Sequence, residues 1–214
     1  AKLLGTATTA GRRRCTKVIK SRVSTFVKQR PRFNHLRRLG VNTVQMVRAA
    51  GAPAMLYMVS AQGIGDTLLR QARSAAALAA APEGKGKNPD RVHYAIDGAR
   101  GTSDPAFQSH LEPLGHWATA WWEQWVSRWA MEDSFWRAIG QLKAGVQAPW
   151  AAAQGPAAAV VLTAQRIGWT WGDGHTLRDD TGRTIDLSLD SPAAVTKAAA
   201  ASVRRWRLRR IAAD

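Results

Sequence analysis

Two adjacent carboxylates, Asp179 and Asp180, could by type and spacing hold a pair of metal ions, the arrangement that polymerases use for nucleotidyl transfer. In sites of that kind the pair follows an apolar strand and an aromatic residue. Here Arg178 precedes the pair and Thr181-Gly182 follows it, a composition typical of a turn between strands. We therefore interpret the two aspartates as turn residues.

A second candidate for metal chemistry is the segment VHYAIDG at 92–98, which resembles the first strand of ribonuclease H with its metal-binding aspartate at Asp97. Glu132 lies downstream on an expected helix. That fold needs a hairpin directly after the aspartate, whereas residues 99–114 carry glycine, two prolines and a helix start. A later strand ending in an aspartate is also missing, so we expect neither hybrid hydrolysis nor DNA synthesis from this chain.

Other catalytic patterns do not occur. No serine has a G-x-S-x-G context, and no phosphate-binding loop of the G-x-x-x-x-G-K-[ST] type is present. The histidines lack the H-x-x-x-H spacing of zinc sites, and Cys15 is the single thiol. These histidines are His35, His93, His110, His116 and His175. We expect no catalytic residue, metal or cofactor in this chain.

The charge distribution points to a polyanionic partner. The net charge is +16, and residues 1–65 contain thirteen Lys and Arg but no acid, since Asp66 is the first. Solvated helix faces would normally include acids for pairing at i+4. A second cationic cluster surrounds Trp206 near the end of the chain. RNA or DNA is the partner we expect.

Six tryptophans in the middle of the chain share one face if their segment forms a single helix. They could be a stacking platform for bases. Only Arg128 and Arg137 lie nearby to bind the phosphate backbone of a nucleic acid strand, so we favour a buried core or an inter-helix interface for the tryptophans. The tryptophans are Trp117, Trp121, Trp122, Trp125, Trp129 and Trp136.

Apolar periodicity predicts a mainly α fold. An amphipathic basic helix is expected within 12–28, short helices after Asn42 and Pro53, and a helix over 67–81 capped by Asp66, with Arg70 and Arg73 outside. The Gly- and Pro-rich segment PEGKGKNP reads as a flexible connection. We therefore expect a basic helical unit at 1–81, a linker at 82–91 and a second domain at 92–214.

The second domain is expected to be tryptophan-rich and helical. Short β-rich segments separated by turn residues predict a small antiparallel hairpin or meander near 167–189. Ser191-Pro192 then starts a basic C-terminal helix ending near Ile211.

Composition also bears on location. No stretch approaches the roughly 20 apolar residues of a membrane span, so no membrane partner is expected. The lone cysteine excludes an intramolecular disulfide and favours an intracellular compartment, with nucleus and cytoplasm left open. Because the chain begins at Ala1 without a signal-peptide pattern, we expect a fragment or a processed N-terminus.

Several short motifs follow one another along the first part of the chain. A basic run follows Leu3-Leu4-Gly5, and the further motifs are RRLG at 37–40, RAAGAPA at 48–54 with Tyr57, GIGD at 63–66 and LLRQAR at 68–73. Their order resembles one region of non-LTR (LINE-type) retrotransposon reverse transcriptases, the region just after the palm where an L-G motif leads into the helical thumb. RIGW at 166–169 and the tryptophan-rich segment resemble the region after the thumb in some such elements.

This resemblance implies a thumb that grips template and primer, with the polymerase acids and their Mg²⁺ in an upstream palm of a parent RNA-directed DNA polymerase. The chain would then be a non-catalytic fragment, from an intact or a decayed copy. The positions matching the thumb's cations are Arg12, Arg13, Arg14, Lys17, Lys20, Arg22, Lys28, Arg37 and Arg38. To these nucleic-acid-binding candidates the C-terminal cluster adds Arg204, Arg205 and Arg207.

Two alternatives stay open. The chain could be an independent basic RNA- or DNA-binding protein, or a protein-interaction module that uses its tryptophan-rich face.

Overall fold

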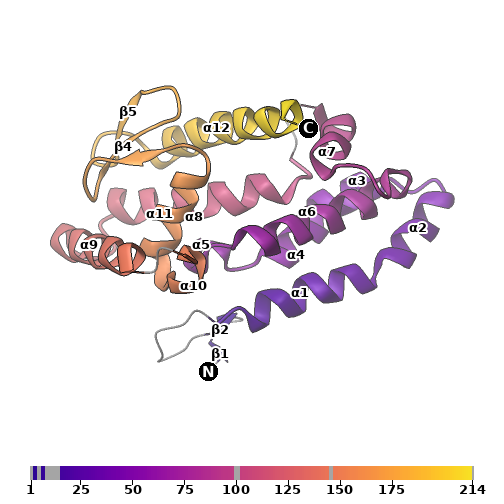
Figure 1. Ribbon diagram of the computed structural model, residues 1–214, viewed down its shortest axis with the longest axis horizontal. Coiled ribbons are helices and arrows are strands. Elements are labelled where there is room, and N and C mark those ends of the chain that lie inside the picture. Colours follow the sequence, from indigo (N-terminus) through magenta and orange to yellow (C-terminus); the bar gives the residue numbers. More distant parts are fainter. Residues whose placement is uncertain (1, 4–5, 8–14, 99–101, 145–146, 214) are drawn as a thin grey trace.

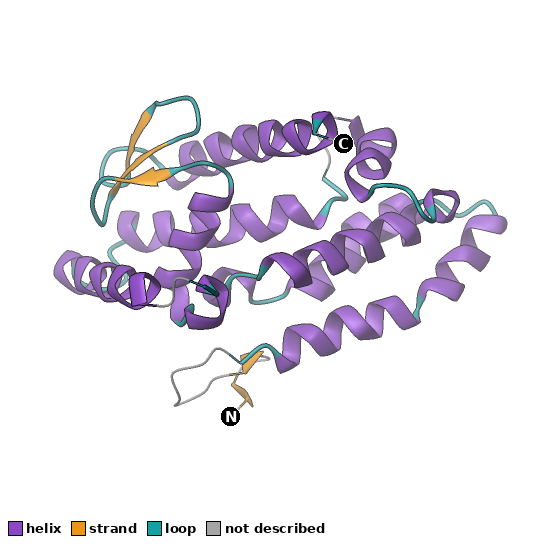
Figure 2. Cartoon of the chain, in the orientation of Figure 1, coloured by secondary structure: helices purple, strands orange, loops and turns teal. Residues whose placement is uncertain are grey.

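The computed structural model describes residues 2–3, 6–7, 15–98, 102–144 and 147–213. It is mainly helical, with a small three-stranded antiparallel sheet and a long C-terminal helix, as predicted (Figures 1 and 2). The candidate residues Arg12, Arg13 and Arg14 lie outside the described residues.

The first part of the chain forms a series of helices after a short antiparallel strand pair. Ile19, Val23 and Phe26 recur at helical spacing in the first long helix and are buried. Asn42 caps the third helix as expected, accepting a hydrogen bond from the backbone N–H of Gln45 at 3.1 Å. The elements are β1 (Lys2–Leu3), β2 (Thr6–Ala7), α1 (Lys17–Lys28), α2 (Arg30–Arg38), α3 (Thr43–Met46), a π-helical turn (Val47–Gly51), α4 (Ala52–Leu56), α5 (Val59–Gln62) and α6 (Asp66–Ala80).

Helix α6 starts one residue earlier than predicted. Gly65 is its N-cap, and Asp66 lies in the first turn. The Asp66 carboxylate instead forms an ion pair with Arg166, with 2.8 Å between Oδ1 and Nε. The inner side of α6 is built from alanines that leave almost no exposed surface: Ala72, Ala75, Ala76, Ala79 and Ala80.

The expected linker is more structured than its composition indicated. A 3-10 turn spans Pro82–Gly84, and α7 (Pro89–Asp97) begins inside the expected linker, capped by Asn88. The VHYAIDG segment is therefore mostly helical, so the resemblance of its sequence to a ribonuclease H strand does not extend to its structure. Asp97 ends the helix and accepts a hydrogen bond from Ser103 N at 2.6 Å.

The remaining helices and the sheet complete the fold. Strand order in the sheet is β3-β4-β5, and Leu177 pairs with Ile185, both of them buried. The three strands lie within the meander predicted near 167–189. The elements are α8 (Pro105–Trp122), α9 (Arg128–Ala144), α10 (Pro149–Ala152), α11 (Gly155–Arg166), β3 (Thr170–Trp171), β4 (Thr176–Arg178), β5 (Thr184–Asp186) and α12 (Pro192–Ala212).

Helices far apart in the sequence lie side by side. In Figure 1, α12, α8, α6 and α1 follow one another from one edge of the molecule to the other, and each packs on the next. One hydrophobic cluster gathers buried residues between Ile19 and Ala80, and a second gathers those between Ala106 and Val203. Because α4, α5 and α6 pack on α8, and α5 also packs on α11, the two clusters adjoin each other.

No helix among the described residues combines the length and apolar character that a membrane crossing requires.

Candidate nucleic-acid interface

A groove between α1 and α6 brings cations together without an acid. Its volume is about 560 Å³. Lys20, Lys28, Arg30 and Arg70 line it, and no Asp or Glu is among the described residues around it. The groove follows from the amphipathic pattern of α1, since burying Ile19, Val23 and Phe26 against α6 leaves the lysines at solvent.

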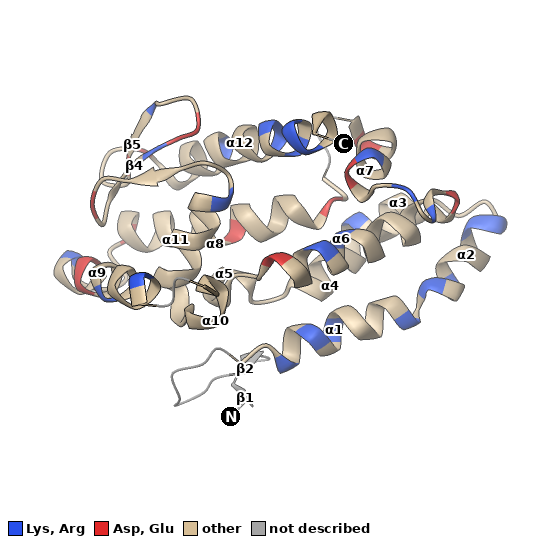
Figure 3. Ribbon diagram, viewed as in Figure 1, with Lys and Arg blue, Asp and Glu red and all other residues tan. Residues whose placement is uncertain are grey.

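The predicted cations of α1 and α2 differ in their surroundings. Lys17, Lys20 and Lys28 are exposed on α1, and Arg38 is exposed on α2. Figure 3 shows Lys and Arg, but no Asp or Glu, along both helices. Arg37 is also exposed, but it forms an ion pair with Glu83 at 2.9 Å.

Arg22 has a structural role that the sequence did not indicate. Its Nη1 donates to the carbonyl oxygen of Tyr57 at 2.8 Å, and its guanidinium lies over the Tyr57 ring, 5.1 Å from the centroid. This residue therefore joins α1 to the end of α4.

The C-terminal cluster does not form one cationic surface. Arg204 is exposed, whereas Arg205 donates two hydrogen bonds to Asp180, at 2.8 and 2.5 Å. Arg207 is only 2% exposed and forms an ion pair with Asp104 at 2.9 Å between Nε and Oδ2. This burial does not favour the prediction that Arg207 binds nucleic acid, because its guanidinium is in the interior.

Two arginines of the groove, Arg30 and Arg70, were not among the predicted site residues. The sequence predicts Arg70 on the solvent-facing side of its helix, and Arg70 is exposed. Arg73 had been expected outside as well, but it is 3% exposed, so that expectation is wrong. The spacing indicates this burial, since Arg73 lies four residues after Leu69 and three before Ala76, within the apolar stripe of α6.

Arg73 is the centre of a buried ion network. It donates to both oxygens of Asp104, at 2.8 and 2.7 Å, and to Asp90 at 2.6 Å. Arg207 pairs with Asp104, and Arg210 pairs with Asp90 at 3.1 Å. The network therefore ties α6, α7 and α12 to the start of α8.

The charges of this network reinforce one another. Burial lowers the pKa of Arg73, but the charges of Asp104 and Asp90 and their hydrogen bonds outweigh burial and raise it above its ordinary value. Burial likewise opposes ionisation of Asp104, yet the Arg73 charge and hydrogen bonds hold the pKa of that carboxyl well below its usual range. The pKa of Arg207 is lowered by burial.

Two histidines lie buried beside the network. His93 Nε2 donates to the carbonyl oxygen of Arg73 at 3.0 Å, and His110 Nδ1 donates to that of Ala106 at 2.6 Å. Burial lowers the pKa of His93, and burial lowers the pKa of His110 to about 3. Both rings are therefore neutral at pH 7. Among the described residues, no group of three or more His, Cys, Asp and Glu side chains could hold a metal ion.

The aspartate pair is a turn, as interpreted. Asp179 Oδ1 accepts from the backbone N–H groups of Thr181 and Arg183, at 2.8 and 3.0 Å, which closes the loop between β4 and β5. Asp180 points the other way, onto α12. Hydrogen bonds from Arg205 hold the pKa of Asp180 well below its usual range.

The six tryptophans do not share one buried face. Trp117 and Trp121 are buried, at 5% and 3% exposure, but Trp129 is 73% exposed. Trp122, Trp125 and Trp136 are also exposed. The expected single helix is interrupted between α8 and α9, so the prediction of a largely buried face holds for its first two members only.

Comparison of the chain with protein-family models, curated proteins and solved structures finds no match.

Proposed function

We propose that this chain binds nucleic acid through the phosphate backbone, using the cationic groove between α1 and α6. The observation that carries this proposal is the acid-free lining of the groove by Lys20, Lys28, Arg30 and Arg70. Lysines and arginines that each neutralise a phosphate release counterions and supply affinity without base recognition. Weak sequence preference and strong salt dependence follow.

The test is a salt titration of binding to a labelled duplex, followed by fluorescence anisotropy. The variant Lys20→Glu/Lys28→Glu/Arg70→Glu should weaken binding to all sequences alike. It should also flatten the slope of log affinity against log salt by about 2 to 3, since each phosphate contact contributes about 0.9.

The matched control places the same three charge reversals at exposed positions away from the groove, Lys143→Glu/Arg178→Glu/Lys197→Glu. It lowers the net charge equally but should change the slope by less than about 1. Equal effects of the two triple variants would exclude the groove, and an affinity independent of salt would exclude phosphate binding altogether.

On the resemblance to non-LTR reverse transcriptases, we infer further that this binding is the template–primer grip of a thumb. The order of the motifs on a basic helical unit supports this inference. A primed template should then bind more tightly than a single strand of the same length, and the chain alone should extend no primer. Extension, or hybrid cleavage abolished by Asp97→Asn, would contradict the non-catalytic assignment.

The exposed tryptophans favour a second candidate, a protein-interaction surface, because large exposed apolar patches commonly mark such sites. The alternative use of these rings is base stacking. Trp129→Ala would in that case weaken single-strand binding by about 1 to 3 kcal/mol and leave duplex binding unchanged. Unchanged single-strand affinity would favour the protein surface.

A further inference from the structure

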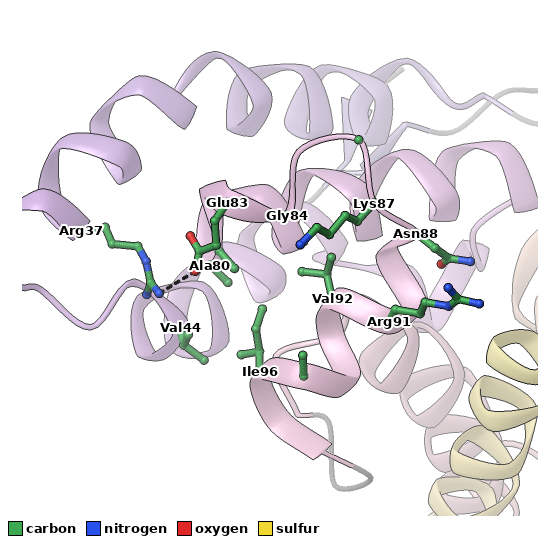
Figure 4. Close-up of a pocket in the computed structure, with 13 residues that line it drawn as sticks. Arg37, Val44, Ala80, Glu83, Gly84, Lys87, Asn88, Arg91, Val92 and Ile96 are labelled. Carbon is green, nitrogen blue, oxygen red and sulfur yellow. Dashed lines mark hydrogen bonds and ion pairs between the residues drawn. The ribbon is translucent and has the colours of Figure 1, made fainter. Parts of the chain in front are cut away.

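A second hollow, separate from the groove, lies where α6 ends and the chain turns into α7. Its volume is about 760 Å³, within the range of about 300 to 1,000 Å³ common for small-molecule sites. The apolar part of its wall comes from three helices, with Val44 on α3, Ala80 on α6, and Val92 and Ile96 on α7 (Figure 4).

Two glycines shape the loop that closes one side. A Cβ on Gly84 would lie 2.9 Å from Val92 Cγ2, so only glycine lets the chain lie this close to α7. Gly86 has a φ of +81°, which turns the backbone back toward Lys87. The wall of the hollow is therefore set by local backbone geometry.

Three cations stand around the hollow, and two of them are unpaired. Arg37 is neutralised by Glu83, 2.9 Å away at one end (Figure 4). Lys87 and Arg91 also line the hollow, and their side chains are exposed and have no ion pair or hydrogen bond within the described part of the chain. In Figure 4 the Lys87 ammonium lies above Val92, whereas the Arg91 guanidinium points the other way, toward Asn88. An apolar wall with unpaired positive charges at its rim fits a ligand with an apolar body and one anionic head.

No aromatic ring is among the described residues that line the hollow, so a nucleobase would find no aromatic side chain to stack on there. We propose that this hollow binds an unbranched aliphatic carboxylate. The chain lies along Val44, Val92 and Ile96. The carboxylate is held by Arg91, whose planar guanidinium matches two carboxylate oxygens, and the Lys87 ammonium adds a second positive charge at the rim.

The test is isothermal titration of the full chain with decanoate, decanol and decyltrimethylammonium, each below its micelle concentration. Decanoate should bind with one-to-one stoichiometry, about two- to fivefold more tightly than decanol, the factor expected of a partly exposed ion pair. Decyltrimethylammonium should bind most weakly. Equal affinities for the three heads would overturn the role of the cations.

Variants separate the hollow from general attraction of anions to a basic protein. Lys87→Ala/Arg91→Ala should reduce decanoate affinity to that of decanol, and Ala95→Trp, an exposed helix position on the wall, should abolish binding by filling the space. Lys85→Ala, on the same loop but outside the lining, is the matched control and should bind normally. Undiminished decanoate affinity in the Lys87→Ala/Arg91→Ala variant, or any retained binding in Ala95→Trp, overturns the proposal, as does tighter binding of adenosine monophosphate than of decanoate.

Discussion

A guanidinium removed from water needs carboxylates on more than one side, and Arg73 has two. Asp104 meets it with both oxygens and Asp90 with one. The sequence analysis expects Arg73 on the solvent-facing side of its helix, because charged side chains are usually exposed. The position of Arg73 in the apolar stripe, however, indicates burial. Its partners stand 17 and 31 residues away, and no local rule pairs residues at such separations. That part of the structure could not be predicted from this sequence alone.

Removing one member of this buried network should be costly. We expect Asp104→Asn to lower the free energy of unfolding by about 3 to 5 kcal/mol, because it leaves Arg73 and Arg207 buried without their shared carboxylate. Asp180→Asn is the comparison, since its partners Arg205 and Arg209 can turn to solvent, and it should cost only about 1 kcal/mol. Urea unfolding of both variants measures the difference, and similar losses would contradict the distinction.

The buried histidines predict a dependence of stability on pH. The unfolded chain takes up a proton at His110 below a pKa of about 6.5, whereas the folded chain does so only near a pH of about 3. The unfolded state therefore binds more protons between these values, and the free energy of unfolding falls as the pH is lowered through that window. Between pH 7 and pH 5, His110 alone should account for a loss of about 2 kcal/mol.

His110→Asn keeps an N–H donor for the Ala106 carbonyl but cannot titrate. Urea unfolding at the two pH values should show a correspondingly smaller loss in this variant. The same pH dependence in both proteins would mean that His110 is not the cause.

The interruption between α8 and α9 shows how far element prediction could go. Helices with caps and prolines, and the meander with its turn residues, follow from local signals. The break does not, because the four-residue spacing of tryptophans continues through it and residues 123–127 contain neither glycine nor proline. Gln124 has a φ of +51°, and Trp125 Nε1 donates to Glu123 at 2.7 Å. These local contacts end the helix and expose the later tryptophans.

The two sides of this break should respond differently to truncation. Trp121→Ala should cost about 3 to 5 kcal/mol, as for large aromatic residues in cores. Trp129→Ala should change the free energy of unfolding by less than about 1 kcal/mol, as for exposed positions. Trp125→Ala should also cost less than Trp121→Ala, because the Trp125 side chain is 50% exposed. Thermal and urea unfolding of the variants provide the measurement.

At the scale of the whole molecule, the two larger hydrophobic clusters share helix contacts and an ion network, and a third, small cluster of Ala77, Ala81 and Val92 spans the expected linker. The division at 82–91 was inferred from composition alone. Composition indicates where a chain can bend, but it does not report whether the two sides pack on each other.

We expect both clusters to unfold in one transition. All ten tryptophans are at residue 117 or beyond, so their fluorescence reports the second cluster, whereas far-ultraviolet circular dichroism reports the helices of both. The two signals should change at the same urea concentration, because α6 cannot leave α8 without exposing Arg73 and Asp104. A loss of ellipticity before the change in fluorescence would show that the first cluster unfolds independently.

The alanine side of α6 has a consequence for the evolution of this sequence. Ala72, Ala76, Ala79 and Ala80 have no exposed surface, and even one added methylene group would have to displace a neighbouring helix, at about 1 to 3 kcal/mol for each such insertion. Descendants of this chain should therefore drift freely at outward positions such as Gln71 while the inward ones stay small. A lineage that enlarged one of these alanines would need a compensating reduction on the helix opposite, so that substitutions in the two helices would become coupled over time.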